Sequence, residues 1–81
     1  MKVLTTHRSD RDYARLPAVI RKIVDKQFVL LAKDLHYPSL RAKKYDENRD
    51  IWQARVTRGY RFYFRIVGDM YEILTIIKHP S

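Results

Sequence analysis

Arginines at alternating positions are the side chains of this sequence best suited to bind a charged substrate. Between Ile51 and Gly68 the sequence holds four arginines and no acidic residue. The guanidinium group is a planar fork of donors that matches the oxygens of a phosphate. Nearby Tyr63 offers a ring on which an unpaired base can stack. The pattern favours phosphate binding, and the alternative is a solvated sheet face without a ligand.

His79 is the histidine that the sequence places nearest to these arginines. An imidazole exchanges a proton near neutral pH, so it can act as an acid or a base in RNA cleavage. The alternative is a frayed terminal histidine without a role. Three further cations precede the arginine-rich strands, and we expect them at the rim of the same surface: Arg41, Lys43 and Lys44.

Motifs for other chemistries are missing from the sequence. It has no cysteine, and its three histidines are too scattered to form a metal set. The carboxylates that could pair for a metal fall at an expected helix start or in a loop, where acids are ordinary, so a carboxylate metal site is disfavoured: Asp10 with Asp12, and Asp46 with Glu47 and Asp50. The sequence contains no P-loop, no dinucleotide-binding glycine motif and no serine nucleophile elbow. We therefore predict no metal and no cofactor.

The overall charge predicts a polyanionic partner. The chain has 81 residues, with 17 Lys and Arg against 9 Asp and Glu, and a formal net charge of +8. Its hydrophobic content of 46% is too high for a disordered basic tail, and its length predicts one domain over residues 1–81. No stretch approaches the roughly 20 apolar residues of a membrane span, and charges interrupt the N-terminus where a signal peptide is apolar. We expect a cytoplasmic protein.

Residues in the first half of the sequence show the patterns of helices, and those in the second half mostly show the alternation of strands. A capping box of Ser9 and Asp12 predicts a first helix to Leu16, and a second helix runs from Pro17 to about Leu35. The strands are predicted over residues 2–6, near 40–44 in a charged loop, and over 51–57, 60–67 and 70–77. The predicted fold is α+β, with an N-terminal helical hairpin packed on one face of a small, mainly antiparallel twisted sheet.

The loop at Arg58-Gly59 decides which residues share a face of the sheet. A two-residue loop places apolar side chains beside arginines, whereas a three-residue loop pairs Val56 with Phe62 and separates the two kinds. We prefer the three-residue loop. Its core face is Trp52, Ala54, Val56, Phe62, Phe64 and Ile66, and its open face is Gln53, Arg55, Thr57, Arg61, Tyr63 and Arg65.

The loop at Gly68-Asp69 fits two residues and sets Arg65 opposite Glu72. The predicted core side of the last strand is then Tyr71, Ile73, Thr75 and Ile77, and the open side is Met70, Glu72, Leu74 and Ile76. Apolar residues beside arginines form a surface suited to an acidic, amphipathic partner segment.

Three segments carry a family resemblance: HYPSLRAKK at 36–44, IWQARVTRGYRFYFRI at 51–66 and GDMYEILTIIKH at 68–79. Their specific content is a basic loop, an aromatic strand start, Arg-Val, and Gly-Tyr-Arg before an apolar strand. In this order they resemble the toxins of the RelE/ParE superfamily of bacterial type II toxin–antitoxin systems. The resemblance covers most of the chain, including the N-terminal segment RDYARLP.

The resemblance implies a small α+β toxin held silent by an antitoxin protein. Its RelE-like branch consists of metal-independent endonucleases that cut messenger RNA, typically in the ribosomal A site, by attack of the 2′-hydroxyl on the adjacent phosphate. Arg61 matches the family's phosphate-contacting arginine, Arg55 a basic position on the preceding strand, and His79 a catalytic histidine of the YafQ-like members. The RNA-binding positions expected around them are Lys43, Lys44, Arg41, Tyr63 and Arg65.

Two other functions remain open at this point. The ParE-like branch poisons DNA gyrase without cutting RNA, and a basic module can bind nucleic acid without toxicity. The residues Arg55, Arg61 and His79 together favour the nuclease. The sequence ends at Ser81, whereas family nucleases commonly continue into a segment whose Tyr or Phe packs on the substrate base. This either reduces activity or leaves stacking to Tyr63.

Overall fold

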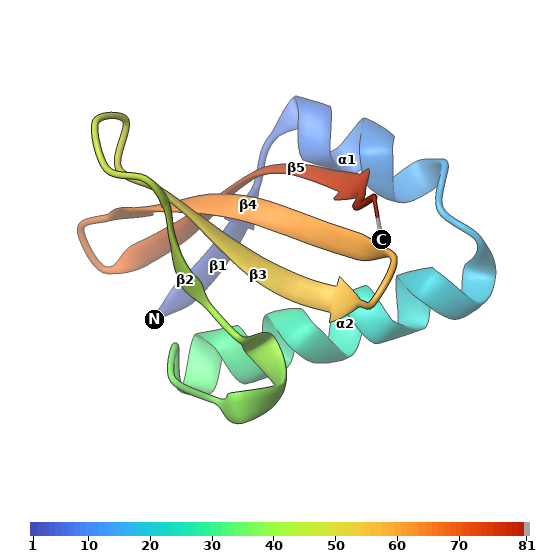
Figure 1. Cartoon of the computed structure of the whole chain (residues 1–81), viewed down its shortest axis with the longest axis horizontal. Helices are drawn as coiled ribbons and strands as arrows, with labels where there is room; N and C mark the ends of the chain where they lie inside the picture. Colours follow the sequence, from blue (N-terminus) through green and yellow to red (C-terminus); the bar gives the residue numbers. More distant parts are fainter. Residues whose placement is uncertain (81) are drawn as a thin grey trace.

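The computed structural model describes residues 1–80, so that Ser81, the last residue of the predicted domain, lies outside the described residues. The elements are β1 (Lys2–Thr5), α1 (His7–Ala14), α2 (Ala18–Lys33), the 3₁₀ helix η1 (Pro38–Leu40), β2 (Lys43–Asp46), β3 (Ile51–Thr57), β4 (Tyr60–Val67) and β5 (Met70–Lys78). The five-stranded sheet has the order β1-β5-β4-β3-β2 and is antiparallel except for the parallel pair of β1 and β5. Helix α2 lies along one side of the sheet, and α1 lies beside the end of β5 (Figure 1). The predicted α+β class is confirmed.

Helix α1 begins earlier than the sequence predicts. Thr6 is its N-cap residue, and its hydroxyl accepts a hydrogen bond from the Ser9 amide while the Ser9 hydroxyl accepts one from the Thr6 amide. Ser9 therefore closes the capping box instead of opening it. The predicted box of Ser9 and Asp12 is wrong because the Asp12 carboxylate is bound to β5.

Helix α2 packs an apolar stripe on the sheet. Val24 and Leu31 are fully buried, and Gln27 between them is buried as well. The Gln27 side-chain amide donates to the backbone carbonyls of Ser39, at 3.1 Å, and Arg55, at 2.8 Å. A buried polar group needs such hydrogen-bond partners. Gln27, which interrupts the apolar stripe, therefore connects α2 to η1 and β3.

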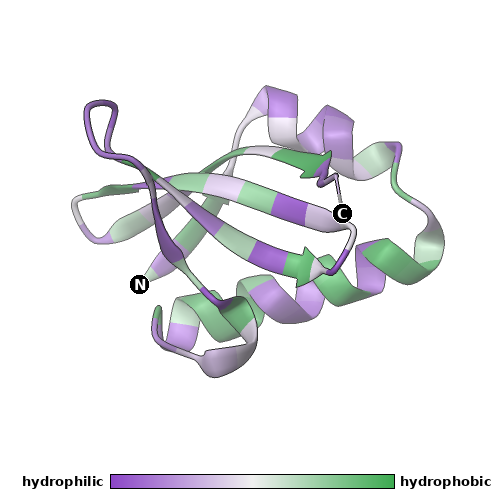
Figure 2. Cartoon of the chain, in the orientation of Figure 1, coloured by the Kyte–Doolittle hydropathy of each residue, from purple (hydrophilic) through white to green (hydrophobic). Residues whose placement is uncertain are grey.

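The faces of β3 and β4 are as predicted, but the register that produces them is not. Thr57 pairs with Tyr60 across a two-residue turn, and an irregularity at Val56 then sets Arg55 opposite Arg61 and Ala54 opposite Phe62. The predicted three-residue loop is wrong. The extra residue lies in the strand as a bulge, which has the same effect on which side chains face the core. Purple and green bands accordingly alternate along β3 and β4 (Figure 2).

Strand β5 changes face at a second bulge. Near the turn, Arg65 pairs with Glu72 and Phe64 with Ile73, as predicted, and Gly68 adopts φ +61° in the turn. The register then shifts at Leu74, so that Tyr63 pairs with Thr75. The predicted faces are therefore wrong beyond this point: Ile76 is buried at 3% exposure, whereas Ile77 is 40% exposed.

Asp12 of α1 supports the change of face. Its Oδ2 atom accepts hydrogen bonds from the Thr75 hydroxyl, at 2.5 Å, and from the Ile76 amide, at 3.1 Å. The backbone amide of Ile76 is thereby paired with a carboxylate 64 residues away in the sequence. This long-range bond has no local signal in the sequence.

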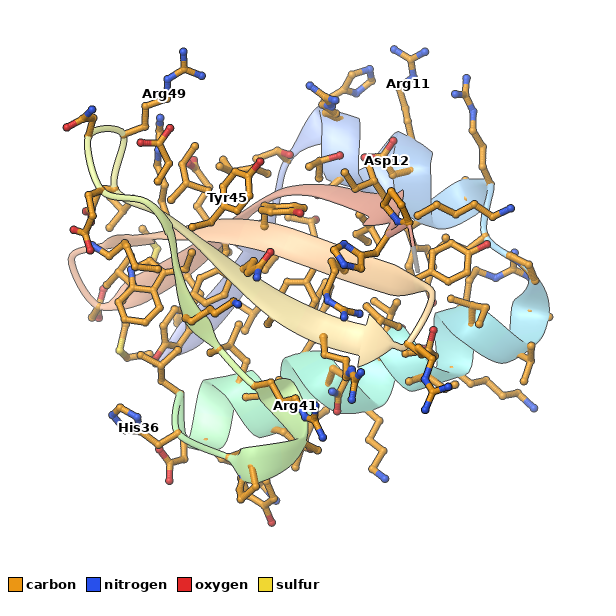
Figure 3. All side chains as sticks on the ribbon, in the orientation of Figure 1. Arg11, Asp12, His36, Arg41, Tyr45 and Arg49 are labelled. Carbon is orange, nitrogen blue, oxygen red and sulfur yellow. The ribbon has the colours of Figure 1, made fainter. Side chains whose placement is uncertain are left out.

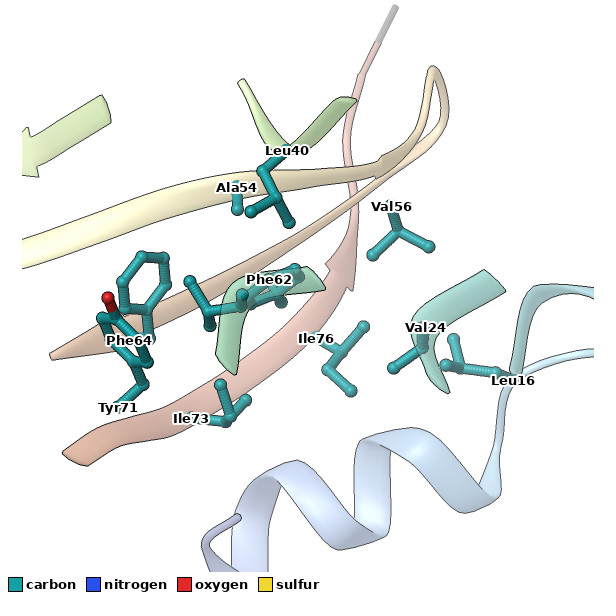
Figure 4. Close-up of a cluster of buried hydrophobic side chains, with 11 residues drawn as sticks. Leu16, Val24, Leu40, Ala54, Val56, Phe62, Phe64, Tyr71, Ile73 and Ile76 are labelled. Carbon is teal, nitrogen blue, oxygen red and sulfur yellow. The ribbon is translucent and has the colours of Figure 1, made fainter. Parts of the chain in front are cut away.

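The core lies between the sheet and α2. Phe62 is at its centre, near Val24 of α2 and Leu40 of η1 (Figure 4). Phe28 packs edge-on against Phe62, with ring centroids 5.1 Å apart. The aromatic and aliphatic core holds the sheet rigid and leaves its other face free to carry the polar side chains. In the described part of the chain, no helix is long and apolar enough to cross a membrane.

We expect Gln27→Leu to lower the free energy of unfolding by about 1–3 kcal/mol, because two carbonyls lose their buried donor. Urea unfolding followed by circular dichroism measures the change. Lys26→Leu is the control, since it introduces the same side chain one residue away at an exposed position of α2, where changes are usually within about 0.5 kcal/mol. Equal stability of the two variants would show that the amide does not hold η1 and β3.

Candidate nucleic-acid interface

Most of the cationic residues that the sequence singles out line one pocket on the open face of the sheet. The cavity has a volume of about 250 Å³. We call it the arginine pocket. Its lining comes from η1, β2, β3, β4 and the residue after β5: Arg41, Lys43, Gln53, Ala54, Arg55, Arg61 and His79.

Arg55 and Arg61 form its floor as directly opposed residues of β3 and β4. Like charges opposite each other across strands repel. The pKa of Arg55 is lowered by burial and by the nearby charges of Arg41, Arg61 and Arg58. Within the described residues, the Arg55 Nε atom is buried and has no hydrogen-bond partner. Such an unpaired donor among cations favours an anion as ligand.

Arg61 is held in place by the turn between β3 and β4. Its Nη1 atom donates to the carbonyls of Thr57, at 2.5 Å, and Tyr60, at 3.0 Å, with a longer bond to Arg58 at 3.4 Å. These bonds involve one nitrogen of the guanidinium group. Within residues 1–80, the other two nitrogens of this guanidinium group make no hydrogen bond and are available to a ligand.

His79 lies at the edge of the arginine pocket. The backbone amide of His79 donates to the Gly59 carbonyl at 2.8 Å, next to the last ladder pair of Tyr60 with Lys78. The chain is therefore still attached to the sheet at His79, whose side chain is half-buried. His79 lines the arginine pocket together with Arg55 and Arg61.

Arg41 reaches the arginine pocket from a strained position. It follows η1 in the left-handed region, at φ 45°, which is uncommon for residues other than glycine. Figure 3 shows Arg41 where η1 approaches β3. The Gln27 amide holds the carbonyl of Ser39, two residues earlier, and that of Arg55. Sequence reasoning did not assign Gln27 a role, although its place in an apolar stripe was a signal.

Three of the predicted RNA-binding residues lie outside the arginine pocket: Lys44, Tyr63 and Arg65. Lys44 pairs with Trp52, so it faces the opposite side of the sheet from Lys43. Its ammonium group lies 5.1 Å from the Trp52 ring centroid and bonds to Asp50, which raises the pKa of Lys44. Arg65 is exposed and lies opposite Glu72.

The arginine pocket is not neutralised by acidic side chains. In the part of the chain that the structure describes, the ion pairs join Lys44 to Glu47 and Asp50, and Arg49 to Asp46. All of these lie in or beside the loop between β2 and β3, and Figure 3 shows Arg49 at its tip. Residues 1–80 contain no group of three His, Cys, Asp or Glu side chains that could hold a metal ion.

Solved structures share this fold, although no family model and no curated protein matches the sequence. A YoeB/ParE toxin from Agrobacterium tumefaciens has a TM-score of 0.81 at 20% identity, over 99% of this chain and 100% of that one. The RelBE2 toxin–antitoxin complex of Mycobacterium tuberculosis has a chain with a TM-score of 0.78 at 23% identity, over 96% of both chains.

The isolated RelE toxin of E. coli is a third similar structure. Its TM-score is 0.79 at 14% identity, over 99% of this chain and 85% of that one. The resemblance seen in the sequence is thus confirmed at the level of the fold. The chain adopts the RelE-like fold of the RelE, YoeB and ParE toxins.

Proposed function

We propose that this protein is the toxin of a type II toxin–antitoxin system and cuts messenger RNA without a metal, in the ribosomal A site. The observation that carries the proposal is the arginine pocket, where an unpaired donor of Arg55 and two free nitrogens of Arg61 adjoin His79. The similar structures support the toxin role and an antitoxin partner, because they are toxins, alone or in toxin–antitoxin complexes.

Arg55 and Arg61 bind the scissile phosphate in this proposal. The 2′-hydroxyl oxygen attacks the phosphorus, a new P–O bond forms, and the bond from phosphorus to the 5′-oxygen breaks. The products are a 2′,3′-cyclic phosphate and a 5′-hydroxyl. Charge builds up on the phosphoryl oxygens during this step, and preorganised guanidinium groups stabilise it without rearrangement.

His79 transfers a proton in the same step. It acts either as the base that takes the proton of the 2′-hydroxyl or as the acid that gives one to the departing 5′-oxygen. Arg41 and Lys43 are cations at the rim, where they bind the neighbouring phosphates of the strand. The predicted contacts of Lys44, Tyr63 and Arg65 with RNA remain predictions, since these residues lie outside the arginine pocket.

We expect Arg61→Ala and His79→Ala each to lower the rate of mRNA cleavage by about 10²–10³, because each removes a group that acts on the transition state. Induction in growing cells, followed by mapping of mRNA ends, measures the loss. Arg49→Ala is the control, since it removes the same charge from an exposed residue outside the arginine pocket.

Intact mRNA in translating cells after induction of the wild-type protein would contradict the nuclease. The gyrase alternative gives a different pattern: DNA-damage signalling, co-purification of gyrase and no effect of His79→Ala. A non-toxic basic module gives no growth defect, and its binding to nucleic acid falls steeply as salt rises.

We expect Arg41→Gly to weaken RNA binding while raising the free energy of unfolding by about 1 kcal/mol, because glycine adopts the left-handed conformation without strain. Filter binding of single-stranded RNA and urea unfolding measure the two effects. Asp50→Gly is the matched control, since Asp50 also has a positive φ, of 58°, but lies outside the arginine pocket. If Arg41→Gly leaves RNA affinity unchanged, Arg41 is not part of the binding surface.

A further inference from the structure

Gln53 of β3 brings a neutral amide into a pocket that is built mainly of cations. It pairs with Lys43 of β2 on one side and with Tyr63 of β4 on the other, and its half-buried side chain lines the arginine pocket. The predicted open face already contained Gln53, but the reaction proposed above gives this residue no role.

The arginine pocket is rich in hydrogen-bond donors and poor in acceptors. Arginine and lysine side chains only donate, and the methyl group of Ala54 does neither. Among the lining residues that the structure describes, two side chains can therefore accept a hydrogen bond. These are Gln53, through its amide oxygen, and His79, through the unprotonated nitrogen of a neutral imidazole.

A sugar–phosphate backbone has the opposite balance of groups. The phosphoryl oxygens accept hydrogen bonds, which matches the guanidinium groups of the pocket. In RNA, a 2′-hydroxyl stands beside each linking phosphate and can donate a hydrogen bond, and DNA lacks this group. An acceptor placed next to the bound phosphate therefore recognises ribose.

Gln53 and His79 lie on opposite sides of the two arginines that face the phosphate. Gln53 precedes Arg55 by two residues on the same face of β3, and Arg55 is opposite Arg61 of β4. His79 lies beyond these arginines, where its backbone amide bonds to the Gly59 carbonyl in the turn. Neighbours on one face of a strand are about 7 Å apart along it. A phosphate held by the two arginines thus has one acceptor on each side.

The chemistry of the reaction decides which side chain adjoins which oxygen. In phosphoryl transfer the attacking and the leaving oxygen lie on opposite sides of the phosphorus atom. The departing 5′-oxygen needs a proton, which an imidazolium can give and a neutral amide cannot. His79 therefore suits the 5′-oxygen, and Gln53 suits the 2′-hydroxyl on the other side.

We propose that Gln53 recognises the ribose of the substrate by accepting a hydrogen bond from the 2′-hydroxyl that attacks the phosphate. The inference rests on the proposed function, because it takes RNA as the substrate. Gln53 orients the hydroxyl but does not take its proton, since a neutral amide is a very weak base. The proton passes to water as the new P–O bond forms. Gln53 is thus the residue that selects RNA over DNA.

Two single strands of the same uracil-containing sequence test the proposal, one with ribose and one with deoxyribose. Binding is measured in the His79→Ala background, which keeps the RNA intact and removes the other acceptor. We expect this protein to bind the RNA about three- to tenfold more tightly, as one neutral hydrogen bond allows. Adding Gln53→Leu is expected to remove the preference by weakening the RNA complex only, whereas a loss of structure would weaken both complexes.

Two further variants in the same background sharpen the comparison. Gln53→Glu keeps an acceptor at this position, so we expect the ratio of RNA to DNA affinity to persist although the new charge weakens both complexes. Asn48→Leu is the matched control, because it removes an amide from an exposed residue outside the arginine pocket. It is expected to leave both affinities unchanged.

Ribosomes with a bound message provide a second measurement if the free protein binds neither strand. We expect a single 2′-deoxy nucleotide at the cut position to weaken binding of the His79→Ala protein to these ribosomes. The protein that also carries Gln53→Leu is expected to bind both messages equally.

The outcomes separate the two proposals. An RNA preference that survives Gln53→Leu, or one that is already absent in His79→Ala, overturns the role of Gln53 while mRNA cleavage by the wild-type protein still stands. Intact mRNA in cells together with an RNA preference that depends on Gln53 overturns the nuclease but supports ribose recognition. Intact mRNA together with equal binding of RNA and DNA overturns both.

Discussion

The buried side-chain amide of Gln27 joins three elements of the molecule: α2, η1 and β3. Gln27 of α2 donates one hydrogen bond to the Arg55 carbonyl of β3 and one to the Ser39 carbonyl of η1. Val24 and Leu31 fix α2 in the core. Because Gln27 belongs to this helix, its two hydrogen bonds also fix η1 and β3 at the arginine pocket. Side chains of the pocket are thus placed by groups on the other side of the sheet.

Among the described residues, no acidic side chain lines the arginine pocket, and this affects the stability of the protein. Opposed guanidinium groups and an unpaired Nε atom are unfavourable in the free protein. The rigid sheet keeps them together, so an anion that enters meets donors already oriented for it. The acids of the chain lie elsewhere, as on the loop between β2 and β3, where Lys44 and Arg49 are paired. Within the described residues, the cations of the arginine pocket therefore lack acidic partners, whereas the cations of the loop between β2 and β3 have them.

Local patterns in the sequence predicted the strands and the composition of the β3–β4 faces, but not the bulges. The alternation of apolar and polar residues and the glycines in the turns were sufficient to predict β3 and β4. The alternation also correctly placed Arg55 and Arg61 on the same face of the sheet. The bulge at Leu74 lies between residues that bond to Thr6 and Asp12, more than 60 residues away in the sequence, so no local window contains these contacts. The start of α1 was missed because Thr6 and Ser9 are both good capping residues, and their reciprocal bonds decide which of them caps. The sequence did not indicate that Lys44 faces away from Lys43, because this orientation comes from its pairing with Trp52 in an edge strand of four residues.

The parallel pairing of β1 with β5 sets an order of events during synthesis. Lys2 pairs with Met70, so the first strand has no partner until the last strand has been made. Asp12 and the backbone amide of His79 likewise find their partners only when β5 joins the sheet. Contacts of such long sequence separation form late in folding. The arginine pocket is therefore complete only after His79, which follows β5, has been made.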